Sequence, residues 1–344
     1  MSRSSWSLGQ RWKNDAIVVA TAAAIELGLA VPRSWLPGLG SAVGWLAHAL
    51  FRGARRTTLR NLELVHADFG PGECKAFTRE IFRTLGRNLT DTVALLDPTE
   101  APDRTLGITR ESREVLDGAL AEGRGVVYAT CHLGPWERMA ALLASLGYPI
   151  TTLARESYDF RLQQLVYERL RSPRNIETIH RGASTAPFAI VRALRRGRVL
   201  GFLVDLQGRA QRSQAVTWLG RSSRVAIGPA RLALRTGAPI VIGTPAPGIA
   251  GELSVRIAKL STADLPDGNA GEALLCQRIA DALSERIRAL PAHWPWMHPS
   301  FGHGGGPEAA PSHTAGRPEA VPSNTTPSLP VEAGRSAGHF RLVQ

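Results

Sequence analysis

The sequence has few cysteines and few lysines, and it lacks repeated long apolar runs. Its three cysteines, Cys74, Cys131 and Cys276, lie far apart, which excludes a disulfide framework and a zinc site with paired ligands. A polytopic membrane protein would need several apolar runs of about 20 residues, and these are missing. A hydrophobic fraction of 44% with 20% charged residues also excludes a wholly disordered chain of this length, 344 residues. The composition therefore predicts a protein with a buried core.

Positive charge dominates, although lysine contributes little to it. Lys+Arg number 41 against 29 Asp+Glu, for a net charge of +12, and lysine occurs only at Lys13, Lys75 and Lys259. The many arginines occur together with abundant Ala, Gly and Pro, as in GC-rich genomes, so arginine content alone does not indicate phosphate recognition. We expect a surface this basic to attract acidic proteins, anionic lipid headgroups or nucleic acid.

Composition divides the chain into three parts. We expect membrane-anchoring helices over residues 1–56, an α/β domain over residues 57–301, and a disordered tail over residues 302–344. The tail is rich in Gly, Pro and Ala and has almost no large apolar side chains. It cannot bury enough surface to offset the entropy lost on ordering.

The first part carries the features of a membrane-associated segment. Two apolar runs, Ala16–Val31 and Trp35–Phe51, are flanked by basic residues, and four of the eight tryptophans lie near them: Trp6, Trp12, Trp35 and Trp45. Basic flanks and tryptophans are typical of helices that dip into a bilayer or lie on it. The alternatives are a signal peptide, for which no clean cleavage site follows Val31, and two buried helices of a soluble protein.

In the second part, short β-rich runs alternate with helical patterns. Strands are predicted at residues 125–130, 149–153, 175–179, 198–204 and 238–242, with an edge strand at 253–258. Helices are predicted near residues 72–96, 136–147, 160–170, 185–195, 228–236 and 275–287. This alternation predicts an α/β fold with a largely parallel sheet flanked by helices.

The candidate chemistry begins directly after the strand at 125–130, in the segment Cys131–Glu137. His132 stands at the carboxyl end of a strand, where open α/β sheets bind ligands. Glu137 falls in the first turn of the next helix, from which its carboxylate can reach the imidazole and make it an oriented general base. Alternatively, His132 only ends the strand, and Glu137 complements the helix dipole.

A Cys–His nucleophile is a competing interpretation of the same segment. Adjacent strand residues point to opposite faces, so Cys131 and His132 should diverge, which favours a buried thiol. The sequence contains no Gly-x-Ser-x-Gly elbow, Walker loop or dinucleotide glycine pattern. These absences favour direct transfer from a bound donor to a base-activated acceptor.

Two further groups of residues are candidates for the same site. Asp205 and Gln207 follow the strand at 198–204 and should lie at the same sheet edge as His132. Asp205 either orients a ligand or a basic residue there, or belongs to a turn. Arginines that can hold an oxyanion or an anionic donor, unless they are simply solvated, are Arg155, Arg169 and Arg171.

The segment HLGPWE (132–137) resembles the His-x-x-x-x-Asp/Glu motif of the glycerolipid acyltransferase superfamily, in the form found in the lipid A lauroyl/myristoyl acyltransferases. The likeness extends over residues 16–301. Further segments match in order and spacing: Thr58–Leu62, Arg155–Ser157, Arg169–Arg171, Val204–Gln207, Thr217–Gly220, Gly228–Ala230 and Trp296–His298.

The resemblance implies an O-acyltransferase that uses an acyl carrier protein thioester or acyl-CoA, with no cofactor or metal. Its acceptor would be a hydroxyl of a lipid A precursor or a related glycolipid; lysophospholipids and phosphoinositide mannosides are the alternatives. His132 would be the general base and Glu137 its orienting partner. Arg169 would stabilise the oxyanion, with Arg171 the second choice.

The implied partners are acyl carrier protein and anionic membrane lipids. Because the donor is cytoplasmic, we expect the protein at the inner membrane with its catalytic domain facing the cytoplasm. The alternative from another class is a basic protein without activity that binds a membrane surface or nucleic acid. No basic motif with interleaved aromatics supports nucleic-acid binding, so we expect no nucleic-acid partner.

Overall fold

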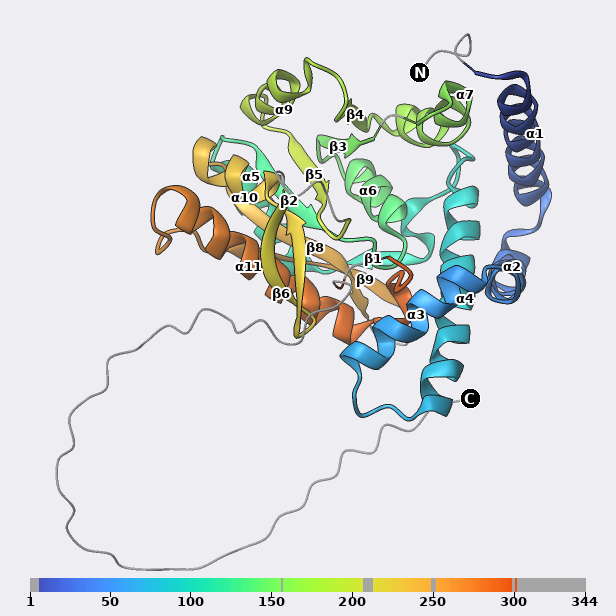
Figure 1. Cartoon of the computed structure of the whole chain (residues 1–344). Coiled ribbons are helices and arrows are strands. Elements are labelled where there is room, and N and C mark those ends of the chain that lie inside the picture. The colour runs from blue at the N-terminus through green and yellow to red at the C-terminus, as the bar shows by residue number, and fades with distance from the viewer. Residues whose placement is uncertain (1–5, 156, 207–212, 249–251, 299–300, 302–344) are drawn as a thin grey trace, which may run out of the picture. The chain divides into compact units, whose positions relative to one another are not determined.

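A seven-stranded sheet forms the centre of the molecule (Figure 1). The structure is a computed structural model that describes residues 6–155, 157–206, 213–248, 252–298 and 301. The strand order is β1-β9-β8-β2-β5-β3-β4, with bounds β1 Leu106–Ile108, β2 Val126–Thr130, β3 Ile150–Ala154, β4 Glu177–His180, β5 Val199–Leu203, β8 Ile240–Pro247 and β9 Leu253–Leu260. Strands β8, β2, β5, β3 and β4 run parallel, whereas β9 is antiparallel to β8. The predicted α/β fold with a largely parallel sheet is confirmed.

Helices cover both faces of this sheet, which is why its central strand is buried along its whole length. The covering helices are α5 Arg110–Ala121, α6 Trp136–Ser145, α9 Ala186–Arg195, α10 Gly228–Thr236 and α11 Gly268–Ala289. Successive β2 side chains alternate between two cores, as strand geometry requires. Val127 and Ala129 join the core that includes α11, and Val126 and Tyr128 join the core that includes α5 and α6.

Two further segments complete the α/β part. Residues 160–171 form α7 (Phe160–Gln163), a π-helical turn (Gln164–Glu168) and α8 (Arg169–Arg171), where one longer helix was predicted. Strands β6 (Ser213–Trp218) and β7 (Arg221–Ala226) make a separate antiparallel hairpin. The prediction that residues 253–258 form an edge strand is wrong, because β1 pairs with the outer side of β9.

The N-terminal helices are α1 (Leu8–Ala30), α2 (Leu36–Leu50) and α3 (Arg52–Val65), followed by α4 (Pro71–Ala94). Glycines bring α2 and α4 into close contact. A Cβ atom on Gly44 would collide with the Phe82 carbonyl, and one on Gly86 with the Gly40 carbonyl. The backbones can approach only because these positions lack side chains. This packing leaves the opposite face of α2 uncovered by the rest of the described chain.

One of the two sequence-based boundaries can be located. The division expected after residue 56 falls inside α3, and the tail at 302–344 lies outside the described residues. Within the described ranges, no helix taken singly has both the length and the apolar character of a membrane span. Helix α1 and residues 33–50 meet these criteria only as a pair, with a bend of 112° between them.

Candidate active site

His132 and Asp205 meet at the carboxyl edge of the sheet. Strands β2 and β5 are parallel neighbours whose ends, Thr130 and Leu203, are paired in register. His132 and Asp205 each lie two residues beyond these ends, so the topology places them side by side. Their Nδ1 and Oδ1 atoms are 2.8 Å apart, and the His132 backbone N–H donates to Asp205 Oδ2 at 2.9 Å. The prediction that Asp205 shares an edge with His132 is confirmed.

The hydrogen bonds to Asp205 fix the orientation of the imidazole. A carboxylate only accepts hydrogen bonds, so the Nδ1 atom of His132 carries the proton, and Nε2 is left as the acceptor. The indole N–H of Trp294 donates to Asp205 Oδ2 at 2.9 Å, which holds the carboxylate in place. Asp205 is fully enclosed, whereas His132 keeps partial access to solvent. The pair has the geometry of an oriented general base.

Electrostatics strengthen His132 as a base. Burial alone would lower the pKa of the imidazole, but the charge of Asp205 and its hydrogen bond outweigh burial, so the pKa lies above the ordinary 6.5. Burial would raise the pKa of Asp205, but the His132 charge and the hydrogen bonds from His132 and Trp294 hold that pKa below 3.8. Both shifts favour a carboxylate beside an imidazole that readily takes up a proton.

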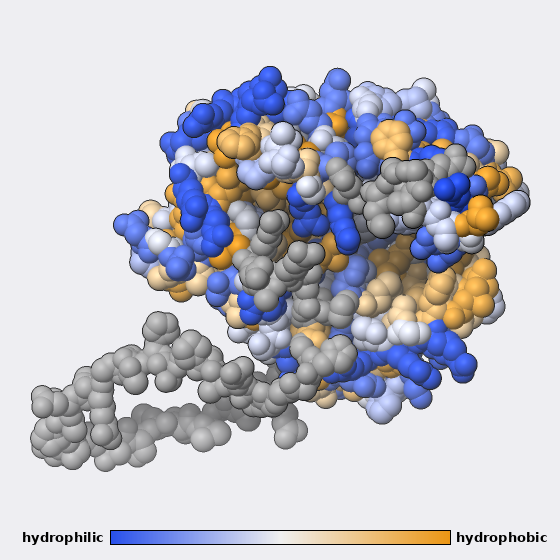
Figure 2. All heavy atoms as spheres, turned by 45° about the horizontal axis from the view of Figure 1, so that its top comes forward, coloured by the Kyte–Doolittle hydropathy of each residue, from blue (hydrophilic) through white to orange (hydrophobic). Residues whose placement is uncertain are grey.

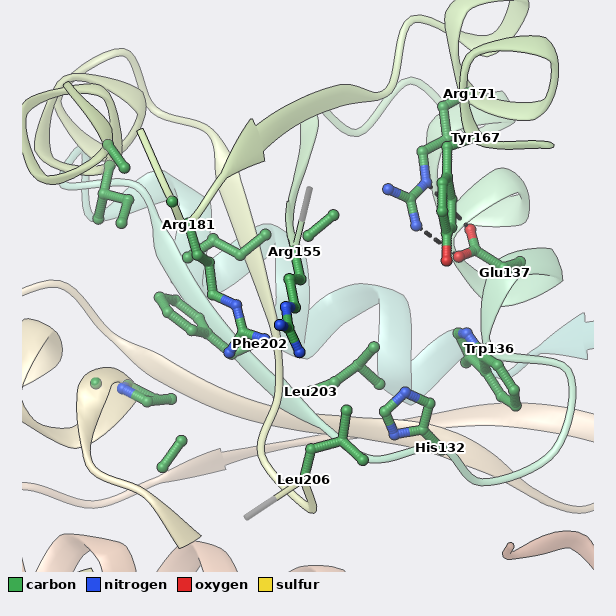
Figure 3. Close-up of a pocket in the computed structure, with 18 of the residues that line it drawn as sticks. His132, Trp136, Glu137, Arg155, Tyr167, Arg171, Arg181, Phe202, Leu203 and Leu206 are labelled. Carbon is green, nitrogen blue, oxygen red and sulfur yellow. Dashed lines mark hydrogen bonds and ion pairs between the residues drawn. The ribbon is translucent and has the colours of Figure 1, made fainter. Parts of the chain in front are cut away.

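Glu137 does not contact the imidazole, which corrects the prediction that it orients His132. Its carboxylate is buried and accepts from Arg171, at 2.5 Å from Nη2 to Oε1 and 3.3 Å from Nε to Oε2. The Arg171 guanidinium also stacks over the Tyr167 ring, 4.8 Å from its centroid. Figure 3 shows Glu137 directed toward α8 and away from His132. Because Arg171 is itself buried, it requires a buried anion, and Glu137 supplies it.

The two arginines of α8 face different surroundings. Among the described residues that line the cleft beside His132, Arg171 is present and Arg169 is not. Arg169 instead forms an ion pair with Glu26 of α1 at 2.6 Å, and both side chains are partly exposed. Positions two apart on a helix point to nearly opposite sides, so one of the two must leave the cleft. The structure thus does not bring the expected oxyanion residue, Arg169, to the site.

The remaining predicted residues are placed as follows. Arg155 follows β3, is exposed, and lines the cleft. Gln207 lies outside the described residues. Cys131 is completely buried, and burial raises the pKa of its thiol, which confirms the predicted buried thiol and leaves the Cys–His nucleophile without support. Within the described ranges, His, Cys, Asp and Glu side chains form no group of three suited to a metal ion.

The cleft beside His132 has a volume of about 1110 Å³ and is mostly apolar. Helix α4 contributes Leu85 and Leu89, and α6 and the start of α10 contribute Trp136 and Pro229. Further apolar lining comes from β3, β5, α8, α9 and the segments next to them, including Leu153, Leu170, Ile190, Phe202, Leu203 and Leu206. A second, narrower pocket of about 60 Å³ shares five lining residues with the cleft: Trp136, Glu137, Leu153, Arg171 and Leu203. It is lined by apolar side chains of the sheet and α6, including Tyr128, Met139, Leu143, Ile150 and Val199.

Sequence reasoning missed two neighbours of the His132–Asp205 pair. Trp294 reaches Asp205 from 89 positions further along the chain. The His298 ring lies 5.6 Å from that of His132, and Asn61 holds the His298 carbonyl with a 2.9 Å hydrogen bond. The segment Trp296–His298 gave a family match, but the sequence offered no signal for its contact with the strand ends. The site therefore combines a base held by Asp205, a largely apolar cleft and a buried Glu137–Arg171 pair.

Comparison with known proteins places this site in a family. Residues 9–302 match the family described as bacterial lipid A biosynthesis acyltransferase. A phosphatidylinositol mannoside acyltransferase of Mycobacterium tuberculosis (strain CDC 1551 / Oshkosh) is 26% identical over 227 residues, which are 65% of this chain and 66% of the relative. One from strain ATCC 25618 / H37Rv is 27% identical over 201 residues, 58% of this chain and 60% of the relative.

The aligned region thus spans slightly less than two-thirds of the length of these relatives. The family match covers far more of this chain and includes the sheet, the His132–Asp205 pair and the cleft beside it. The resemblance carried by the HLGPWE segment is confirmed. The chain belongs to the bacterial lipid A biosynthesis acyltransferase family.

Proposed function

We propose that the protein is a membrane-associated O-acyltransferase that moves a fatty acyl chain from a thioester to a hydroxyl of a glycolipid. The observation that carries this proposal is the His132–Asp205 pair, which opens into a mostly apolar cleft in a member of this family. The proposed donor is the acyl thioester of acyl carrier protein or of coenzyme A. The proposed acceptor is a lipid A precursor or a related glycolipid, and a phosphatidylinositol mannoside is favoured by the names of the relatives.

In the proposed reaction, Nε2 of His132 takes the proton of the acceptor hydroxyl as its oxygen attacks the thioester carbonyl. Asp205 stabilises the imidazolium that forms, because its carboxylate accepts the Nδ1–H hydrogen bond throughout. The tetrahedral intermediate then collapses, the new C–O bond remains, and the C–S bond breaks. His132 returns its proton to the departing thiolate. No further cofactor is required for this sequence of steps.

The cleft walls suit the acyl chain that the reaction transfers. Leucines of α4 and apolar residues of β5 line the cleft together with His132, and Glu137 and Arg171 line both this cleft and the narrower pocket. A hydrocarbon chain gains free energy in proportion to the apolar area that it buries there, about 25 cal/mol per Å². We propose that the chain lies along this apolar surface while its carbonyl carbon faces His132.

The function is tested by following the product of transfer. The purified full-length protein should convert a labelled acyl-carrier-protein or acyl-CoA thioester and a glycolipid acceptor into an ester-linked acyl glycolipid. The product is identified by mass spectrometry, and cells lacking the protein should lack the corresponding acyl chain. Release of free fatty acid without an acylated lipid, with every acceptor supplied, would contradict the proposal.

We also propose that α1 and α2 bind the membrane surface, with the catalytic domain on the cytoplasmic side of the inner membrane. Three tryptophans on or next to these helices are exposed: Trp12 by 79%, Trp35 by 69% and Trp45 by 55%. Helix α3 follows at once with basic residues at positions suited to anionic headgroups: Arg52, Arg55, Arg56 and Arg60. In Figure 2, apolar residues gather on the right-hand side, where α1 and α2 lie in Figure 1. Such an apolar surface beside arginines is typical of an interfacial anchor.

Replacement of Trp12, Trp35 and Trp45 together by serine should weaken binding to anionic vesicles at least about tenfold. Each tryptophan can bury about 150–250 Å² of surface in the headgroup region. At about 25 cal/mol per Å², the free energy gained from burying even part of this area on all three side chains exceeds that of a tenfold change in binding. Vesicle sedimentation measures the binding. Phe188→Ser, which removes an equally exposed aromatic on α9, is the control and should bind as the unmodified protein does. Undiminished sedimentation of the triple variant would show that these helices do not anchor the protein.

A further inference from the structure

Among the described residues, two arginines in the cleft have no acidic partner. The described residues that line it include four arginines: Arg155, Arg171, Arg181 and Arg231. Arg171 is neutralised by Glu137, and Arg231 pairs with Glu272 at 2.8 Å. No acidic side chain among the described residues pairs with Arg155 or Arg181, although arginines elsewhere in the chain form many such pairs. Within the described residues, the cleft therefore has two arginines that no carboxylate neutralises.

The sheet brings these two arginines together. Strands β3 and β4 are parallel neighbours in which Ala154 is paired with His180. Arg155 and Arg181 are the next residue on each chain, and the backbone N–H of Arg181 donates to the Ala154 carbonyl at 2.9 Å. Both side chains start from the same edge, and Figure 3 shows their guanidinium groups converging beside Phe202, on the side of the cleft opposite Glu137.

Two guanidinium groups that share a space repel each other, although Arg155 and Arg181 are both exposed and water weakens the repulsion. Glu137 is the single carboxylate among the described lining residues, and Arg171 already occupies it. An anion between Arg155 and Arg181 would relieve the repulsion. Phosphate suits two planar guanidinium groups particularly well, since each can form two parallel hydrogen bonds to its oxygens.

We propose that Arg155 and Arg181 form a phosphate-binding site that holds a phosphomonoester or phosphodiester of a substrate while the acyl group reacts at His132. Arginine content does not carry this inference, because arginine is common throughout this chain. It rests on the convergence in one cleft of two guanidinium groups that pair with no carboxylate of the described residues. The role in substrate binding rests on the proposed function. The phosphate belongs either to the phosphopantetheine arm of the donor or to the acceptor glycolipid.

Steady-state kinetics of the Arg155→Ala/Arg181→Ala protein test the site. The KM of the phosphate-bearing substrate should rise by about tenfold or more, whereas kcat should stay within about threefold, because the lost contacts are equally strong in the ground and transition states. Arg195→Ala is the matched control. It removes the same charge from an exposed position on α9 outside the cleft, and it should change neither constant.

Paired substrates identify where the phosphate comes from. Acyl-CoA is compared with the acyl thioester of N-acetylcysteamine, which lacks phosphate, and a phosphorylated glycolipid acceptor with its dephosphorylated form. In one of the two pairs, the double variant should have a raised KM for the phosphate-bearing substrate and an unchanged KM for its phosphate-free counterpart. That pair identifies the source of the phosphate. A kcat that falls equally with phosphate-free substrates would assign the arginines to the oxyanion and overturn the proposal. Unchanged kinetics with all substrates would overturn it as well.

Direct binding separates this proposal from the proposed function. Calorimetric titration of the full-length protein with coenzyme A, pantetheine, and inositol 1-phosphate needs no acyl transfer. Binding of a phosphate-bearing probe that the double variant loses and Arg195→Ala retains supports the site, even if the protein transfers no acyl chain. A protein that transfers acyl chains but whose phosphate binding is independent of both arginines retains its function and excludes this site.

Discussion

Replacing Asp205 with asparagine should slow acyl transfer by about 10²- to 10⁴-fold, nearly as much as His132→Ala. An amide in this position cannot stabilise the imidazolium that forms as the hydroxyl attacks. The carboxylate now accepts hydrogen bonds from His132 and Trp294, and the NH₂ group of an asparagine would place a donor opposite these N–H donors. Glu137→Gln, which leaves the His132–Asp205 hydrogen bond in place, should lose less. Initial rates at saturating donor and acceptor measure these effects.

The pH profile provides a second measurement on the same variant. The rate should rise with pH as His132 loses its proton, with an apparent pKa above 6.5, because Asp205 raises the pKa of the imidazole despite burial. In Asp205→Asn the charge is gone and burial dominates, so this limb should move to lower pH, below 6.5. A profile that does not move, or a variant as fast as the unmodified protein, would exclude Asp205 as the partner of the base.

Arg171→Ala should lower the free energy of unfolding by about 3–5 kcal/mol, because it leaves the buried Glu137 carboxylate without its cation. Arg169→Ala removes an ion pair between partly exposed side chains and should cost less than about 1 kcal/mol. A double variant, Glu137→Leu/Arg171→Met, should recover most of the stability, since it removes both charges and fills a similar volume. Denaturant unfolding of the four proteins measures the difference.

The double variant also separates stability from chemistry. If Arg171 acts on the oxyanion, the refilled double variant should be stable and yet have a reduced kcat, because that interaction exists only in the transition state. A stable double variant with normal kcat would show that the Glu137–Arg171 pair only holds α6 and α8 together and does not act on the oxyanion. An Arg171→Ala protein as stable as Arg169→Ala would show that the buried pair contributes nothing to the fold.

The sequence by itself determined the fold class, the position of the base and the sheet edge at which the site lies. These follow from local patterns. The mostly apolar run of β2 indicated a strand buried on both faces, and alternation with helical patterns indicated a parallel sheet. His132 and Asp205 could be assigned to one edge because the carboxyl ends of parallel strands always lie there.

Only the tertiary structure decided which of these residues contact one another. Proximity in sequence favoured Glu137 as the partner of His132, but the order β2-β5 brings Asp205 to the imidazole, and the direction of α6 sends Glu137 to Arg171. Likewise, Arg169 and Arg171 share a motif, but helix geometry turns them to opposite sides. The contact of Trp294 with Asp205 and the convergence of Arg155 with Arg181 left no mark in the sequence, because strand order and side-chain direction, rather than spacing along the chain, create them.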